Sequence, residues 1–502
     1  MKNSSLESKF SELTIHGIYF GIGSTLKSSL GLLLIPLYTR DFSAVEYGTL
    51  SLILITGQIL YSIFSFGILA ATLRSYYDYK KKADKDAVIF TAITILAVSG
   101  LTLLVFSFIF SDVISVLIFG SEEYSFHILL ISLIMVISFF SQIPFVVLRA
   151  EKKSKQYVFF ELCFMIIGAL LIILFVRFRE WGIIGVLYGQ LIMFIISIFV
   201  LFFYIRDHII CKVNRREIGI MLRFGAPLIF AGLAGIIFNS IDKYILNMYW
   251  PLDVVGVYSL GYQFGYVLLI LFVNPLQLIW NPMVFSVKDD ANANEFYTKG
   301  FTYALFLGSI LALTISLLSK EAILIISNPE YHKAYSIVPL VALSYFFWGI
   351  PSLVNVGTGL KRKTYFVAIC FGIGAALNII FNFLTIPKYG IMGAAASTLV
   401  SYIVMVVLFI YYNNRIFPLS YEWNRVGFIF IGLFLFMAFG IFVTFPDIFI
   451  SILFKLLLIA GYVCLYYFSN FFSKNEKRVL SLKIRFFLKL VRRKEKGADE
   501  AR

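Results

Sequence analysis

Residues 221–250 read MLRFGAPLIFAGLAGIIFNSIDKYILNMYW, and this stretch decides the fold. From Phe224 to Trp250 it is apolar for long enough to cross a bilayer as a helix. Near its far end it carries two adjacent charged residues, Asp242 and Lys243. An ionised group in the hydrocarbon region costs about 2.5–3.5 kcal/mol, so such residues usually face the interior of a helix bundle or a wet cavity. The stretch therefore predicts a membrane helix with a polar side.

The composition of the whole chain agrees with this prediction. Of its 502 residues, 60% are hydrophobic and 14% are charged. Long uninterrupted apolar runs favour an all-α polytopic membrane protein over a barrel of alternating strands. The net charge of +15 comes from basic residues scattered over short loops and a tail, so we expect no nucleic-acid partner. The four cysteines show no paired spacing, and we expect no metal site and no cofactor.

Apolar runs and loop signals predict about fourteen transmembrane helices. The predicted spans are 14–38, 45–73, 87–111, 124–148, 155–176, 182–205, 224–249, 255–283, 298–319, 333–358, 364–386, 390–412, 426–446 and 448–470. No small-residue cleavage site follows the first run, so we expect an uncleaved first helix rather than a signal peptide.

The distribution of basic residues predicts the orientation. If the N-terminus is inside, most lysines and arginines fall in cytoplasmic loops. The alternating loops hold few, namely Arg40, Arg177, Arg179, Lys320, Lys333 and Lys388. By the positive-inside rule, both termini are expected in the cytoplasm.

The chain contains an internal repeat with a spacing of 208 residues. Pairs at this spacing include Gly48 with Gly256 and Gly182 with Gly390. Local strings agree: EYGTLSL at 46–52 resembles VGVYSL at 255–260, and EWGIIGV at 180–186 resembles KYGIMGA at 388–394. Because six spans separate the copies, both have the same orientation, as in transporters whose halves rock around a central cleft.

The repeat predicts how the chain is divided. We expect an N-lobe (1–213) and a C-lobe (214–421) of six transmembrane helices each, two extra helices (422–471) and a basic amphipathic tail (472–502). The tail has apolar residues at helical spacing and is expected to bind anionic lipids of the inner leaflet. The alternative is a simple stop-transfer charge cluster.

Two groups of charged residues inside predicted spans are candidate site residues. Lys27 is at the middle of the first span among small residues, so it is a candidate for attracting phosphate in a cleft, or for an ion pair with Asp242. Asp242 and Lys243 point about 100° apart on a helix, and Asn239 shares a face with both. We expect one of the two charges to line the cleft, and the sequence leaves open which one.

Four further residues are substrate-binding candidates. Arg74 and Arg149 end the second and fourth spans on the cytoplasmic side, where they either anchor the helices or catch an anionic headgroup. Asn274 and Gln277 form part of a polar face on the eighth span, suited either to sugar hydroxyls or to hydrogen bonds between helices.

No motif for bond-making chemistry is present in the sequence. It has no Walker-type glycine loop, no HExxH and no GxSxG, so we expect a transporter and not an enzyme. A membrane glycosyltransferase or ligase would also need a large outer loop with catalytic residues, and no predicted outer loop is long.

Two stretches carry a family resemblance. GIYFGIGSTLKSSLGLLLIPLYTRDFSAVEYGTLSLI at 17–53 and IDKYILNMYWPLDVVGVYSLGYQF at 241–264 resemble the starts of the two lobes of the bacterial polysaccharide flippases. These belong to the multidrug/oligosaccharidyl-lipid/polysaccharide exporter superfamily. The likeness covers about residues 10–415.

The resemblance implies transfer of an undecaprenyl-diphosphate-linked oligosaccharide across the bacterial cytoplasmic membrane for O-antigen, capsule or a related polymer. It implies cationic residues in the N-lobe cavity, for which Lys27, Arg74 and Arg149 are suitably placed, and it leaves a polysaccharide polymerase open as a further partner. The alternative within the same superfamily is a cation-coupled multidrug exporter, which would favour more buried acids than this chain has.

Overall fold

The computed structural model describes residues 32–361, 363, 365–469, 471–474 and 476–478. All regular secondary structure in these residues is helical. Among them, twelve helices are long and apolar enough to cross a membrane, so the protein is an all-helical, multi-pass membrane protein. The first predicted span lies mostly outside the described residues, and the count of fourteen stays a prediction.

The α-helices are α2 (Ile35–Asp41), α3 (Ala44–Phe64), α4 (Ile68–Asp78), α5 (Lys82–Phe119), α6 (Ser125–Ala150), α7 (Ser154–Ile173), α8 (Gly182–Tyr204), α9 (Arg215–Tyr249), α10 (Leu252–Leu268), α11 (Asn274–Ser286), α12 (Ala293–Ile326), α13 (Val338–Val354), α14 (Val356–Leu360), α15 (Tyr365–Ile416), α16 (Trp423–Phe442) and α17 (Ile448–Phe468). Short 3-10 turns are η1 (Glu122–Tyr124), η3 (Arg206–His208) and η5 (Pro329–Ser336), and π turns are η2 (Leu174–Phe178) and η4 (Leu269–Val273).

The second predicted span, 45–73, contains a break that its hydrophobic pattern does not reveal. Helix α3 ends at Phe64 and α4 begins at Ile68, because Phe66 and Gly67 have positive φ angles of 48° and 60°. A glycine adopts this conformation at little cost, whereas a phenylalanine is strained there. The span is therefore two helices joined by a sharp bend.

The long helix α15 contains a break that the sequence does predict. At 52 residues a straight helix would measure about 78 Å, more than twice the hydrocarbon thickness. Gly390 has a φ of 53° and a ψ of −127°, which interrupts the helix between the two predicted spans 364–386 and 390–412. The indole Nε1 of Trp250 donates to the carbonyl of Ile386 at 2.9 Å and holds this corner in place.

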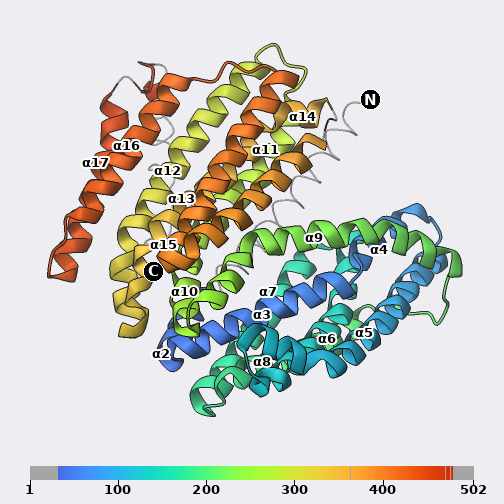
Figure 1. The fold of residues 1–502 in the computed structure, drawn as a ribbon. Helices are drawn as coiled ribbons and strands as arrows, with labels where there is room; N and C mark the ends of the chain where they lie inside the picture. Colours follow the sequence, from blue (N-terminus) through green and yellow to red (C-terminus); the bar gives the residue numbers. More distant parts are fainter. Residues whose placement is uncertain (1–31, 362, 364, 470, 475, 479–502) are drawn as a thin grey trace, which may run out of the picture.

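The helices form two groups, which we name the first bundle (α2–α8) and the second bundle (α10–α15). Figure 1 shows the blue-to-teal helices of the first bundle beside the yellow and orange helices of the second. Helix α9 belongs to both, since it packs against α3, α4 and α5 of the first bundle and against α10 and α15 of the second. Helices α16 and α17 pack on α12 at the outer edge of the second bundle.

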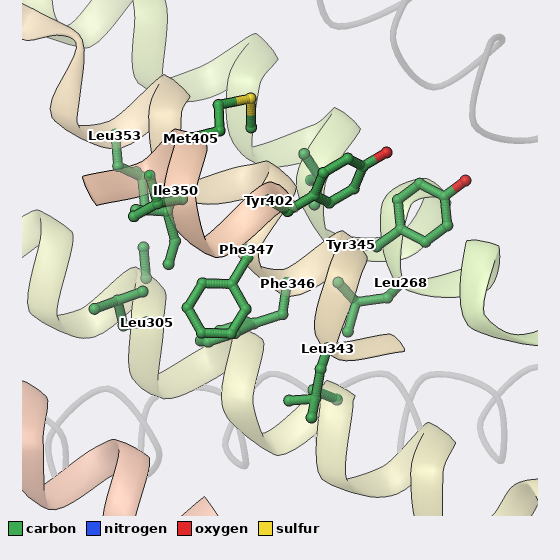
Figure 2. Close-up of a cluster of buried hydrophobic side chains, with 14 of the residues drawn as sticks. Leu268, Leu305, Leu343, Tyr345, Phe346, Phe347, Ile350, Leu353, Tyr402 and Met405 are labelled. Atoms are coloured by element: carbon green, nitrogen blue, oxygen red, sulfur yellow. The ribbon is translucent and has the colours of Figure 1, made fainter. Parts of the chain in front are cut away.

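The second bundle has the largest apolar core. Aromatic and aliphatic side chains from α10, α12, α13 and α15 interdigitate there, as Figure 2 shows for Phe346, Phe347, Ile350 and Met405. Burial of each such side chain contributes about 1.5–3 kcal/mol to stability, so this core stabilises the second bundle.

The connection between α8 and α9 is fastened to the first bundle. His208 of η3 places Nδ1 3.0 Å from Asp86 of α5 and Nε2 3.1 Å from Glu151 after α6. The backbone N–H of Asn214, just before α9, donates to Thr91 at 2.9 Å. The segment that leads into α9 is thus held by the first bundle.

Candidate functional site

Helices α3 and α10 cross with residues that are 208 positions apart facing each other. A side chain at Gly48 would overlap the carbonyl oxygen of Leu252, and one at Gly256 would overlap the carbonyl oxygen of Ala44. The two contacts are equivalent in the repeat, because Leu252 and Gly256 are the counterparts of Ala44 and Gly48 at the spacing of 208 residues. Ser259 then donates to Ser51, its own counterpart in the repeat, at 3.0 Å. We name Gly48, Ser51, Gly256 and Ser259 the crossing.

The bundles also touch at the end where α3 and α10 begin, which we name the Ala44 end. Ser43 and Glu46 form a capping box that fixes the start of α3. From η5 of the second bundle, Glu330 accepts from the backbone N–H of Ala44 at 3.0 Å, and Tyr331 donates to the carbonyl of Ser43 at 2.8 Å. The side-chain amide of Asn328 donates to the carbonyl of Arg40 at 3.2 Å.

Next to the crossing lies a polar cavity of about 560 Å³ between α3, α9, α10 and α13. Its lining includes serines, amides, several tyrosines and a tryptophan: Ser51, Ser240, Ser259, Gln58, Asn239, Gln263, Tyr38, Tyr47, Tyr262, Tyr266, Tyr345 and Trp348. Among the described residues that line this central cavity, Lys243 is the one with a charge. Figure 2 shows Tyr345 close to buried side chains of the second bundle.

A second cavity of about 550 Å³ continues from the first into the first bundle. The two share Gln58, Gly232 and Ile236, and the second adds the polar residues Tyr61, Ser62, Ser65, Ser138 and Gln142. The two cavities are therefore neighbours, and their polar lining residues extend from between the bundles along α9.

Asp242 and Lys243 have different surroundings. The Asp242 carboxylate accepts from the Tyr258 hydroxyl at 2.5 Å and from the backbone N–H of Lys243 at 2.9 Å, so it is bound inside the second bundle. The Lys243 ammonium lies 3.2 Å from the Ser51 hydroxyl and 5.3 Å from the centre of the Tyr262 ring. Lys243 thus lines the cavity, whereas Asp242 does not.

The other predicted site residues are spread over the molecule. Asn239 lines the cavity and donates to the carbonyl of Gly235 at 2.8 Å. Arg74 is exposed, with its guanidinium 4.6 Å above the Phe224 ring of α9. The guanidinium of Arg149 lies 5.8 Å from the ring of Tyr157.

Like Asp242, four further predicted residues are not among those that line the central cavity, namely Arg74, Arg149, Asn274 and Gln277. Asn274 and Gln277 are partly buried on α11 and are not among the residues around the central cavity. Lys27 lies outside the described residues.

Three residues that contact the candidate site were not predicted from the sequence. Ser51 and Ser259 meet at the crossing, and Tyr258 binds the carboxylate of Asp242. The two serines do have a signal in the sequence, because they are paired at the repeat spacing within the strings quoted for the repeat. Tyr258 has none, since its position 16 residues from Asp242 indicates no contact.

Comparison with known proteins gives a family match over most of the chain. Residues 39–336 match the family described as polysaccharide biosynthesis protein. An uncharacterized membrane protein of Methanocaldococcus jannaschii is 30% identical over 170 residues, 33% of this chain and 31% of that protein. The capsular polysaccharide biosynthesis protein CapF of Staphylococcus aureus is 27% identical over 201 residues, 38% of this chain and 49% of CapF. The matches thus span half or less of these relatives' lengths.

Solved structures share the fold. The lipid II flippase MurJ in an inward closed conformation superposes with a TM-score of 0.73 at 20% identity, covering 90% of this chain and 99% of MurJ. An inward-facing multidrug resistance transporter of the MATE family has a TM-score of 0.60 at 12% identity, covering 80% of this chain and 93% of the transporter. The family match and these transporter folds together show that the chain belongs to the polysaccharide biosynthesis protein family and has the fold of the MOP superfamily of transporters.

Proposed function

We propose that the protein is a flippase that moves an undecaprenyl-diphosphate-linked oligosaccharide from the inner to the outer leaflet of the bacterial cytoplasmic membrane. The glycan and diphosphate cross through the central cavity while the lipid tail stays in the bilayer. Both termini are cytoplasmic, and the Ala44 end faces outside. Export follows by alternating access, in which the two bundles rock about the crossing.

The observation that carries this proposal is the chemistry of the central cavity. Tyrosines, a tryptophan and amides offer the flat faces and neutral hydrogen-bonding groups that sugars need. Lys243 supplies a positive charge for a phosphate, and no carboxylate is present among the described residues that line the cavity. A cationic drug would meet an unfavourable charge there, so the cavity supports the anionic lipid over the multidrug alternative.

The proposed architecture has fourteen spans in two six-helix lobes, followed by two extra helices. The break at Gly390 supports counting α15 as two spans, and the contacts between Gly48 and Gly256 support the repeat. The remaining predicted span is residues 14–38. The basic tail, 472–502, binds anionic lipids of the inner leaflet in this proposal.

The relatives support the substrate class. CapF is described as a capsular polysaccharide biosynthesis protein and MurJ as a lipid II flippase. By analogy, the substrate is a lipid-linked sugar unit for a surface polymer, and a polysaccharide polymerase is the proposed downstream partner.

The test replaces Lys243 with methionine, which keeps the length of the side chain but removes the charge. In cells that depend on this protein, Lys243→Met should abolish surface polysaccharide and cause the lipid-linked unit to accumulate inside. Lys320→Met is the control, because Lys320 is a partly buried lysine of the membrane helix α12 that lies outside the central cavity. Normal export by correctly inserted Lys243→Met protein would refute the anion site.

Lys27→Ala should likewise abolish export without removing the protein from the membrane.

A further inference from the structure

Lys243 occupies the boundary between the cavity and the crossing. Its side chain lines the cavity, yet its ammonium donates to Ser51, which is part of the crossing. Ser51 therefore accepts two hydrogen bonds, one from Lys243 of α9 and one from Ser259 of α10. The same hydroxyl joins three helices from both bundles.

The charge of Lys243 has no carboxylate partner within ion-pair distance among the described residues. The neighbouring Asp242 is turned toward Tyr258, and its second oxygen accepts from the Lys243 backbone rather than from the ammonium. The contacts of the ammonium that the structure describes are a neutral hydroxyl and an aromatic ring. A phosphate oxygen forms a stronger, charge-assisted hydrogen bond than a hydroxyl does, so an anion in the cavity would take the ammonium from Ser51.

The crossing depends on few polar contacts. At Gly48 and Gly256 the two backbones touch without any side chain between them. The hydroxyl pair is a polar side-chain link between the facing helices, and Lys243 is a donor that reinforces it from α9. Loss of that donor would leave Ser51 with the hydrogen bond from Ser259 alone.

We infer that Lys243 couples binding of a phosphate-bearing lipid to opening of the Ala44 end. In the empty protein the ammonium reinforces the crossing. When a phosphate enters the cavity, Lys243 moves its hydrogen bond from Ser51 to the phosphate, the crossing weakens, and α3 separates from α10. This inference rests on the proposed function and specifies how substrate binding and gate opening are linked.

Disulfide cross-linking at the Ala44 end tests the inference. The reporter is Arg40→Cys with Asn328→Cys, two exposed positions in contact across the bundles. The background carries serine at the native cysteines Cys163, Cys211, Cys370 and Cys464. The full chain is placed in nanodiscs, and the rate of disulfide formation is measured with undecaprenyl diphosphate or with undecaprenol, the uncharged lipid of the same tail.

Undecaprenyl diphosphate should slow cross-linking about tenfold, the size expected for loss of one hydrogen bond from a charged donor. Undecaprenol should leave the rate unchanged. Lys243→Met and Ser51→Ala should each slow cross-linking without lipid, and neither should respond further to the diphosphate. Equal slowing in Lys243→Met protein, or equal slowing by undecaprenol, would overturn the coupling.

The export assay separates this inference from the proposed function. If Lys243→Met abolishes export while the cross-linking rate ignores the diphosphate, the coupling is wrong and the anion site stands. If Lys243→Met exports normally, the anion site itself is wrong.

Discussion

The helix contacts differ between the two ends of the cavities that lie between the bundles. At the Ala44 end, α3 contacts α10, its counterpart in the repeat. Equivalent residues of the two helices face each other there, Gly48 against Gly256 and Ser51 against Ser259. At the opposite end, the bend at Phe66 and Gly67 receives the backbone of α9 at Gly225, an unsymmetrical contact. The first contact joins the two bundles directly. The second joins the first bundle to α9, a helix that both bundles share, so under the proposed alternating access it can persist while the bundles rock.

The largest expected effect comes from a large side chain at the symmetrical contact. Gly256→Leu places atoms where the Ala44 carbonyl lies, and forcing apart two packed backbones costs about 3 kcal/mol. Cross-linking between Arg40→Cys and Asn328→Cys should fall more than tenfold, and export should stop. Gly372→Leu is the control, because no atom lies within 4 Å of a side chain added there. Unchanged cross-linking in Gly256→Leu protein would mean that the crossing does not hold this end closed.

A smaller substitution at the other end should show that the two contacts are independent. Gly225→Ala overlaps the Phe66 carbonyl and should weaken the contact between α4 and α9 by about 2 kcal/mol. A cysteine pair at Arg74 and Phe224 should then cross-link more slowly, while the pair at Arg40 and Asn328 keeps its rate. Gly235→Ala on the same helix is the control, since its site is open. Equal loss at both ends would contradict the distinction between them.

The two adjacent charges on α9 should respond differently to loss of their partners. Tyr258→Phe removes a donor from a buried carboxylate within the second bundle, which should lower the free energy of unfolding by about 1.5–3 kcal/mol. The cross-linking rate at the Ala44 end should change little, because Lys243 still reaches Ser51. Thermal unfolding in detergent measures the first effect, with Tyr266→Phe as a control on the same helix. A Tyr258→Phe protein as stable as the parent would show that Asp242 does not depend on this bond.

The smallest effect is expected on α11. Asn274 lies outside the central cavity lining, so Asn274→Ala should leave surface polysaccharide within about twofold of the parent level. Quantitative detection of surface polymer measures this. Strong loss of export would move the glycan site toward α11 and would restore the sugar-binding interpretation of its polar face.

Much of the fold could be predicted because hydrophobic runs report membrane spans directly. The predicted span 182–205 coincides with α8, Gly182–Tyr204, and the predicted boundary near 390 coincides with the break at Gly390. The bend at Phe66 could not be predicted, since it lies within an uninterrupted apolar run. The bend packs against Gly225 of α9, a tertiary contact that local sequence does not reveal.

The candidate site was predicted less completely, because a sequence gives the spacing of residues but not the direction in which a helix is turned. The adjacent positions of Asp242 and Lys243 imply different faces, but the hydrogen bond from Tyr258 determines which charge is left for the cavity. Asn274 and Gln277 share a helical face, yet the rotation of α11 keeps that face out of the central cavity lining. The polar role of the crossing was visible only as a spacing of 208 residues.

The central claim is most directly tested by reconstituting the purified protein in liposomes with a fluorescent undecaprenyl-diphosphate oligosaccharide in one leaflet. We predict that the parent protein and Lys320→Met move the lipid to the other leaflet and that Lys243→Met does not. Equal movement by Lys243→Met, or transport of an organic cation by a parent protein that leaves the lipid in place, would contradict the account.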